Sequence, residues 1–273
     1  MGDSALNDRT LDGRAVDDLD AADSGRVRLS VADYFTLGNA LCGFMAVCRL
    51  AAAQLEQFTH GGVVPLNRRD LAAAVVFLLV AAVCDLFDGK VARRYGGSRM
   101  GAELDNLADA ISFGFAPAFF VITWGVFAGD RDAGLSVIAA VAVLLAVVVR
   151  LARFATQPPG QTYFTGLPAP LGAMTVVAIV LLSPPPVAGV PAIIFVAWLM
   201  VSRLEYPKPS GNLAAAVLVW IFASVGCLSA WALDLPFGDV LLFSGAGLVL
   251  LLVVMVPLYT LLARRGGPEA DEL

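Results

Sequence analysis

Residues 85–109 have the sequence DLFDGKVARRYGGSRMGAELDNLAD, and this stretch joins two strongly apolar segments. Asp85 and Asp88 stand three residues apart at the end of the first segment, and Asp105 and Asp109 stand four apart at the start of the second. At about 3.6 residues per turn, each pair lies on one face of a helix. A short turn rich in Gly and Arg separates the pairs. We therefore expect two antiparallel helices that bring four aspartates together at the edge of a membrane.

Four converging carboxylates predict a metal site. Unpaired, they would repel one another and take up protons, whereas one or two divalent cations would keep them ionised. The sequence has a single histidine, so a metal site built on several imidazoles is excluded. Ion pairs between the aspartates and nearby arginines are the alternative. We favour the metal site because carboxylates in membrane segments are costly and usually functional.

Small residues accompany the aspartates on the same helices. Gly89 and Ala92 are three residues apart and leave room on the helix surface for a flat ligand. Gly101 does the same from the opposite helix. This pattern predicts a ligand-binding face beside the carboxylates.

The pattern DxxDGxxAR, followed by GxxxDxxxD, is similar to the signature of the CDP-alcohol phosphatidyltransferase family. The matching positions are Asp85, Asp88, Gly89, Ala92, Arg93, Gly101, Asp105 and Asp109. The resemblance implies a membrane enzyme that transfers a phosphatidyl group from a CDP-activated lipid. It also implies a homodimer and a divalent cofactor, Mg²⁺ or Mn²⁺, with two ions expected.

The resemblance also implies a role for each matching residue. The four aspartates would hold the metal, and Asp109 would in addition take the proton from the acceptor hydroxyl. The nucleotide would lie against Gly89, Ala92 and Gly101, with Arg93 close to it.

The composition predicts an all-α polytopic membrane protein. The chain has 273 residues, of which 59% are hydrophobic and 15% charged, and its mean hydropathy is +0.79. Eight apolar stretches predict membrane-spanning helices at about 31–55, 70–93, 101–127, 134–155, 168–183, 187–203, 212–232 and 239–263. The fifth and sixth are short, and a single re-entrant hairpin would reduce the count to six. The family resemblance implies a six-helix core, here with about two further helices.

The charge distribution predicts the ends of the domain and the orientation in the membrane. Residues 1–29 are expected to be a disordered acidic tail, 30–265 the transmembrane catalytic domain, and 266–273 a short acidic tail. Most of the basic residues fall on one predicted side of the membrane, and only Arg68, Arg69 and Arg131 fall on the other. The first group consists of Arg9, Arg14, Arg26, Arg28, Lys90, Arg93, Arg94, Arg99, Arg150, Arg153, Arg203, Lys208, Arg264 and Arg265. The positive-inside rule therefore places the aspartates and the N-terminus in the cytoplasm of a multi-pass cell-membrane protein.

Polar residues outside the motif complete the candidate site. Asn39 lies in the first helix, where relatives of this family carry an Asn near the diphosphate or metal; bonding to a neighbouring helix is the alternative. Ser112 lies one turn beyond Asp109, where it can line the acceptor pocket or bond back to its own helix. Arg150 and Arg153, at the end of the fourth helix, can grip a phosphate or carboxylate, or extend to lipid headgroups.

Three further segments resemble the serine-using branch of the family. They are SFGFAP at 112–117, RLARF followed by YFTGLPAP at 150–170, and LMVS with YPK at 199–208. The expected reaction is transfer from CDP-diacylglycerol, or an archaeal CDP-ether lipid, to L-serine, with Arg150 or Arg153 on the serine carboxylate. The alternatives are glycerol 3-phosphate, inositol phosphate or choline as acceptor and, remotely, an ion-coupled transporter. The expected partners are these substrates, the bilayer and a second copy, with no nucleic acid.

Overall fold

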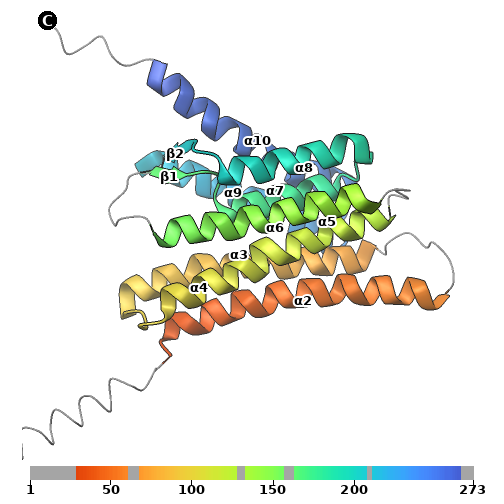
Figure 1. The fold of residues 1–273 in the computed structure, drawn as a ribbon, viewed down its shortest axis with the longest axis horizontal. Coiled ribbons are helices and arrows are strands. Elements are labelled where there is room, and N and C mark those ends of the chain that lie inside the picture. Colours follow the sequence, from red (N-terminus) through yellow and green to blue (C-terminus); the bar gives the residue numbers. More distant parts are fainter. Residues whose placement is uncertain (1–28, 61–67, 128–132, 157–162, 208–210, 266–273) are drawn as a thin grey trace, which may run out of the picture.

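A computed structural model describes residues 29–60, 68–127, 133–156, 163–207 and 211–265. The tails predicted at 1–29 and 266–273 lie outside the described residues, apart from Leu29. The described chain forms a bundle whose long helices lie side by side along a common direction (Figure 1).

The eight predicted apolar segments are confirmed as helices. They correspond to α2 (Val31–His60), α3 (Arg68–Tyr95), α4 (Gly101–Asp109) continued by η1 (Ala110–Phe115) and α5 (Ala116–Phe127), α6 (Ala133–Ala155), α7 (Ala169–Leu181), α8 (Pro186–Val201), α9 (Gly211–Ala232) and α10 (Gly238–Arg265). The third segment is thus one long rod made of three pieces.

The lengths and surfaces of these helices are those of a polytopic membrane protein. Within the described residues, five helical segments are long and apolar enough to cross a membrane: α2, α3, the α4–η1–α5 rod, α6 and α10. The helices α7 and α8 are shorter, with 13 and 16 residues. Large apolar side chains such as Phe44, Ile138 and Phe195 are exposed on the outside of the bundle, as expected where lipid replaces water. The protein is therefore an all-α polytopic membrane protein.

The helices α2 and α3 and the α4–η1–α5 rod pack together on one side of the bundle (Figure 1). The helix α2 packs along α3 and also contacts α4, η1 and α5, while α6 packs between α5 and α8. The helix α10 covers α7 and α9. The side chains of Leu50, Leu78, Phe113 and Phe120 are fully buried where these helices meet. This apolar core fixes the relative positions of the helices that carry the aspartates.

The rod α4–η1–α5 contains a π-helical turn directly after Asp109. The N–H of Ala116 donates to the carbonyl of Ile111, five residues earlier, instead of to the usual fourth. Pro117, which follows, has no N–H and cannot complete a regular helical ladder. The sequence predicts a kink at Pro117, and the structure shows a widened turn just before it.

Two short strands that the sequence did not predict join the loops at the motif end of the bundle. The strand β1 (Tyr163–Thr165) pairs antiparallel with β2 (Glu205–Pro207). Gly166 follows β1 with φ of 81°, and its N–H donates to the Leu204 carbonyl at 2.8 Å. A side chain at Gly166 would meet the Met200 carbonyl oxygen at 2.2 Å, so only glycine fits. This contact ties the loop after α6 to the end of α8.

Candidate active site

The two aspartate pairs project from the adjoining ends of α3 and α4. Asp85 and Asp88 lie in the last turns of α3, and Asp105 and Asp109 lie along α4. Gly96 ends α3 with φ of 87°, and its N–H donates to the Ala92 carbonyl at 3.0 Å. The chain then reverses so that α4 runs back along the bundle (Figure 1). The antiparallel arrangement predicted from the sequence is therefore present.

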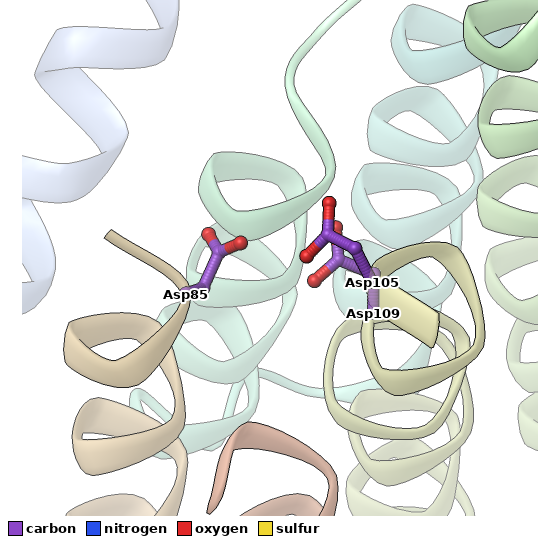
Figure 2. A group of neighbouring side chains, drawn as sticks. All are labelled: Asp85, Asp105 and Asp109. Carbon is purple, nitrogen blue, oxygen red and sulfur yellow. The ribbon is translucent and has the colours of Figure 1, made fainter. Parts of the chain in front are cut away.

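Three of the aspartates form a cluster that can hold a metal ion. Asp85, Asp105 and Asp109 each offer one carboxylate oxygen, and these oxygens lie within 4.8 Å of one another. Figure 2 shows Asp85 on one helix facing Asp105 and Asp109 across the gap between the two helices. Divalent cations such as Mg²⁺ prefer oxygen ligands of this kind.

The fourth aspartate adjoins this cluster. Asp88 is buried and lies within hydrogen-bonding reach of Asp105. Among the described residues, the Oδ1 atom of Asp105 is buried without a hydrogen-bond partner. Carboxylates held this close repel one another in a medium of low dielectric constant. These features therefore fit a divalent cation, which would bind the unpartnered oxygen and offset the repulsion among the carboxylates.

The helix α2 supplies hydrogen bonds to two of the four carboxylates. Thr36 Oγ1 donates to Asp88 Oδ2 at 3.0 Å, and Asn39 Nδ2 donates to Asp109 Oδ1 at 3.1 Å. Both α2 side chains are buried. Asn39 thus lies beside the site, as expected, and it also bonds to a neighbouring helix, which was the alternative. Thr36 was not predicted, although it lies three residues before Asn39 and shares its helix face.

Ser112 lies at the contact between η1 and α2. Its hydroxyl donates to the backbone carbonyl of Asn39 at 2.8 Å, across the interface between η1 and α2. The side chain is fully buried. The hydroxyl therefore bonds to α2 instead of back to its own helix, and its role at the acceptor stays a prediction.

The two arginines at the end of α6 have different surroundings. Arg150 is partly buried and lies close enough to Asp85 and Asp109 to interact with both charges. Its Nε is buried without a hydrogen-bond partner among the described residues. Arg153 is exposed, and its Nη1 donates to the Val201 carbonyl at 2.6 Å, at the end of α8. The structure therefore brings Arg150 to the aspartates and ties Arg153 to the backbone.

The small residues of the motif leave space, as the sequence predicts. A side chain added at Gly89 would meet only the guanidinium of Arg93, at 3.4 Å and beyond. At Gly101 it would meet Asp33 Oδ1 at 3.4 Å and Ser98 Oγ at 3.6 Å. Ala92 is partly buried on the same end of α3, and Arg93 is exposed there. At Gly89 and Gly101 the space beside the backbone is therefore bounded mainly by polar side chains.

The described chain is thus a polytopic membrane bundle with a carboxylate cluster between two antiparallel helices and a cationic side chain beside it. Residues 29–204 match the CDP-alcohol phosphatidyltransferase family over more than half of the chain. The chain belongs to this family. Membership agrees with the motif and disfavours the transporter.

Individual relatives give a finer comparison. The chain is 43% identical over 121 residues to the CDP-diacylglycerol–serine O-phosphatidyltransferase of Mycobacterium leprae, covering 40% of this chain and 38% of that protein. It is 29% identical over 202 residues to the enzyme of the same name from Methanocaldococcus jannaschii, covering 74% of this chain and 83% of that protein. It is 33% identical over 145 residues to the archaetidylserine synthase of Methanothermobacter thermautotrophicus, covering 52% and 60%.

Proposed function

We propose that the protein transfers a phosphatidyl group from CDP-diacylglycerol, or its archaeal ether counterpart, to the hydroxyl of L-serine. The products are phosphatidylserine, or the ether-linked equivalent, and CMP, in phospholipid biosynthesis. The observation that carries this proposal is the carboxylate cluster of Asp85, Asp105 and Asp109 with Arg150 beside it. Family membership and the names of the serine-transferring relatives support it.

The reaction requires one proton transfer and one displacement at phosphorus. The serine oxygen forms a bond to the phosphorus that carries the lipid, and the bond from that phosphorus to the bridging oxygen of CMP breaks. Asp109 accepts the proton of the serine hydroxyl, because it is the most buried member of the cluster and an amide donor already orients it. CMP leaves with the electron pair of the broken bond.

The four aspartates would hold the divalent cofactor, which we take to be two ions of Mg²⁺ or Mn²⁺. When bound, the cations neutralise the diphosphate and polarise the phosphorus that is attacked. The open face at Gly89, Ala92 and Gly101 would receive the cytidine nucleotide, with Arg93 at its edge. Because added side chains at Gly89 and Gly101 meet little, a planar base can approach the backbone closely there.

Arg150 would bind the carboxylate of the serine acceptor. A guanidinium binds a carboxylate in a bidentate manner, and among the described residues the Nε of Arg150 has no protein partner. Its position next to Asp109 would bring the serine hydroxyl to the proton acceptor. Arg153 is less suited to this role because it already bonds to Val201.

The site would face the cytoplasm, and the protein would act as a homodimer. The described basic residues at the carboxylate end of the bundle, such as Arg93, Arg94 and Arg99, support this orientation. The N-terminus would be cytoplasmic, with residues 1–29 as an acidic tail, 30–265 as the catalytic domain and 266–273 as a second tail. The family supports the dimer.

An acceptor panel tests the proposal directly. Purified protein in detergent, supplied with CDP-diacylglycerol and Mn²⁺, is offered serine, glycerol 3-phosphate, inositol phosphate or choline, and CMP release is measured. We expect release that depends on both serine and metal. Release with a different acceptor would keep the carboxylate chemistry and refute the serine assignment. A parallel series with a CDP-ether lipid decides which donor is used.

A further inference from the structure

The helix α2 carries a polar stripe that meets the aspartate cluster from a third side. Thr36, Asn39 and Gly43 recur at intervals of three and four residues, so they share one face of the helix. Thr36 bonds to Asp88 on α3, and Asn39 bonds to Asp109 on α4. One helix outside the signature therefore touches one member of each aspartate pair.

The bond from Thr36 has a definite direction. Its hydroxyl has one hydrogen and two acceptors within reach, the Ala32 carbonyl at 3.3 Å and Asp88 Oδ2 at 3.0 Å. The carboxylate is both the closer and the charged acceptor, and charge-assisted hydrogen bonds are about twice as strong as neutral ones. The hydroxyl therefore favours Asp88 and fixes the rotation of that carboxylate.

The bond from Asn39 is made at a cost. With Nδ2 donating to Asp109, the Oδ1 atom of Asn39 is buried without a partner among the described residues. Turning the amide around would bring its oxygen against the carboxylate oxygen, and two acceptors would then repel each other. An orphaned buried acceptor destabilises the folded protein, and an apolar residue of the same size would avoid this cost. Packing alone therefore does not explain an amide here.

The backbone at Asn39 is held as firmly as its side chain. The hydroxyl of Ser112 donates to the Asn39 carbonyl at 2.8 Å. Asn39 is therefore bonded both to Asp109, through its side chain, and to Ser112, through its backbone. One turn further along α2, Gly43 lies so close to η1 that a Cβ there would lie 2.6 Å from the Cα of Ser112. The contact between α2 and η1 therefore sets where the Asn39 amide meets the carboxylate.

We propose that Thr36 and Asn39 are positioning residues that each occupy one oxygen of an aspartate and leave its second oxygen for the reaction. Thr36 orients Asp88 as a metal ligand, and Asn39 orients Asp109 as ligand and proton acceptor. This inference rests on the proposed function for the roles of the two aspartates. Hydrogen bonds to ligating carboxylates of this kind typically change metal affinity or activity by about 10-fold to 100-fold when removed.

The test uses Mn²⁺ binding to the purified protein in detergent, followed through the electron paramagnetic resonance signal of free Mn²⁺. Thr36→Val and Asn39→Leu remove each donor while keeping the approximate volume. We expect each to weaken Mn²⁺ binding by about 10-fold or more. Thr36→Ser keeps the hydroxyl and should bind as the unchanged protein does.

A matched control separates positioning from packing. Thr175 on α7 is as buried as Thr36, and its hydroxyl donates to the Leu171 carbonyl four residues earlier, just as the Thr36 hydroxyl can donate to the Ala32 carbonyl. In the described structure, however, Thr175 has no carboxylate partner. Thr175→Val should therefore leave Mn²⁺ affinity unchanged. Gel filtration checks the folding of each variant, and Asn39→Ala replaces Asn39→Leu if the larger side chain does not fit.

Turnover distinguishes the two residues from each other. At saturating Mn²⁺, Thr36→Val should regain its kcat, because excess metal restores occupancy. Asn39→Leu should keep a low kcat with an unchanged KM for the lipid donor, because Asp109 remains misoriented. Folded Thr36→Val and Asn39→Leu variants that bind Mn²⁺ as tightly as the unchanged protein would overturn the inference. Mn²⁺ binding without serine transfer would instead refute the proposed acceptor and leave the positioning roles standing.

Discussion

Asp85 and Asp105 face each other from different helices, whereas Asp88 and Asp109 are each tied to α2 by a hydrogen bond. The four aspartates of one motif therefore have two kinds of surroundings. Asp105, with a buried oxygen that lacks a protein partner, is suited to metal binding. Asp109, buried and oriented by an amide, is suited to accept a proton from a substrate held next to it.

Replacing Asp109 with Asn tests this division. The amide has the same shape but cannot accept the serine proton, so kcat should fall by at least about 10²-fold. Excess Mn²⁺ should restore metal at Asp85 and Asp105 but not kcat, because the proton acceptor is still missing. CMP release and Mn²⁺ binding, measured on the same preparation, check the two effects. Full activity in Asp109→Asn would contradict the role of Asp109 as proton acceptor.

Arg150 offers a second test at the level of one side chain. Arg150→Gln removes the cation beside Asp85 and Asp109, and with it the proposed partner of the serine carboxylate. A hydrogen bond to a charged group contributes about 1.5–3 kcal/mol, so the KM for serine should rise roughly 10-fold to 100-fold. The KM for the lipid donor should change little. An unchanged KM for serine would exclude Arg150 from the acceptor site.

The contact between α2 and η1 governs the site at the level of whole elements. Gly43→Ala would place a Cβ 2.3 Å from Ser112 Oγ and 2.6 Å from Ser112 Cα, where backbone cannot yield. We expect a loss of about 1–3 kcal/mol of stability from overpacking, and a lower kcat because Asn39 moves with the helix. Thermal unfolding and CMP release measure the two. In Gly247→Ala on α10 the added Cβ meets nothing within 4 Å, so this control should change neither stability nor kcat.

The helices themselves were predictable because each depends on a local apolar run. All eight predicted segments match helices, and the antiparallel course of α3 and α4 followed from the spacing of the aspartates and the Gly-rich turn. The strands β1 and β2 were not predictable, since each has three residues and pairs with a segment about forty positions away. The π-turn was only partly visible: Pro117 marked an interruption but not its form.

The candidate site was predictable to the extent that its residues lie in one motif. Spacing alone brought Asp85, Asp105 and Asp109 together, and the structure gathers them. The bonds from Thr36 and Asn39, and the separation of Arg150 from Arg153, depend on how helices dock, which no local pattern encodes. Ser112 illustrates the point, because the π-turn rotates its hydroxyl toward α2.

For the molecule as a whole, the carboxylate cluster should couple metal binding to stability. The described cluster joins α3 to α4, and Asp88 and Asp109 link it to α2, so removing the cation would let mutual repulsion separate three helices. A ligand at 100 times its Kd stabilises by about 2.7 kcal/mol, which corresponds to a Tm change of roughly 5–10 °C. Thermal unfolding in detergent with and without a chelator measures this. A double variant, Asp85→Asn with Asp105→Asn, should be insensitive to the chelator.

The shortness of α8 has a consequence for the bilayer around the protein. Its 16 residues rise about 24 Å, against about 30 Å for a typical hydrocarbon layer. Val187, Phe195 and Trp198 are exposed on this helix. Such hydrophobic mismatch thins the neighbouring bilayer at a modest energetic cost. We therefore expect CMP release to be faster in vesicles of short-chain phosphatidylcholine, whose thickness is closer to the length of α8, than in vesicles of long-chain phosphatidylcholine.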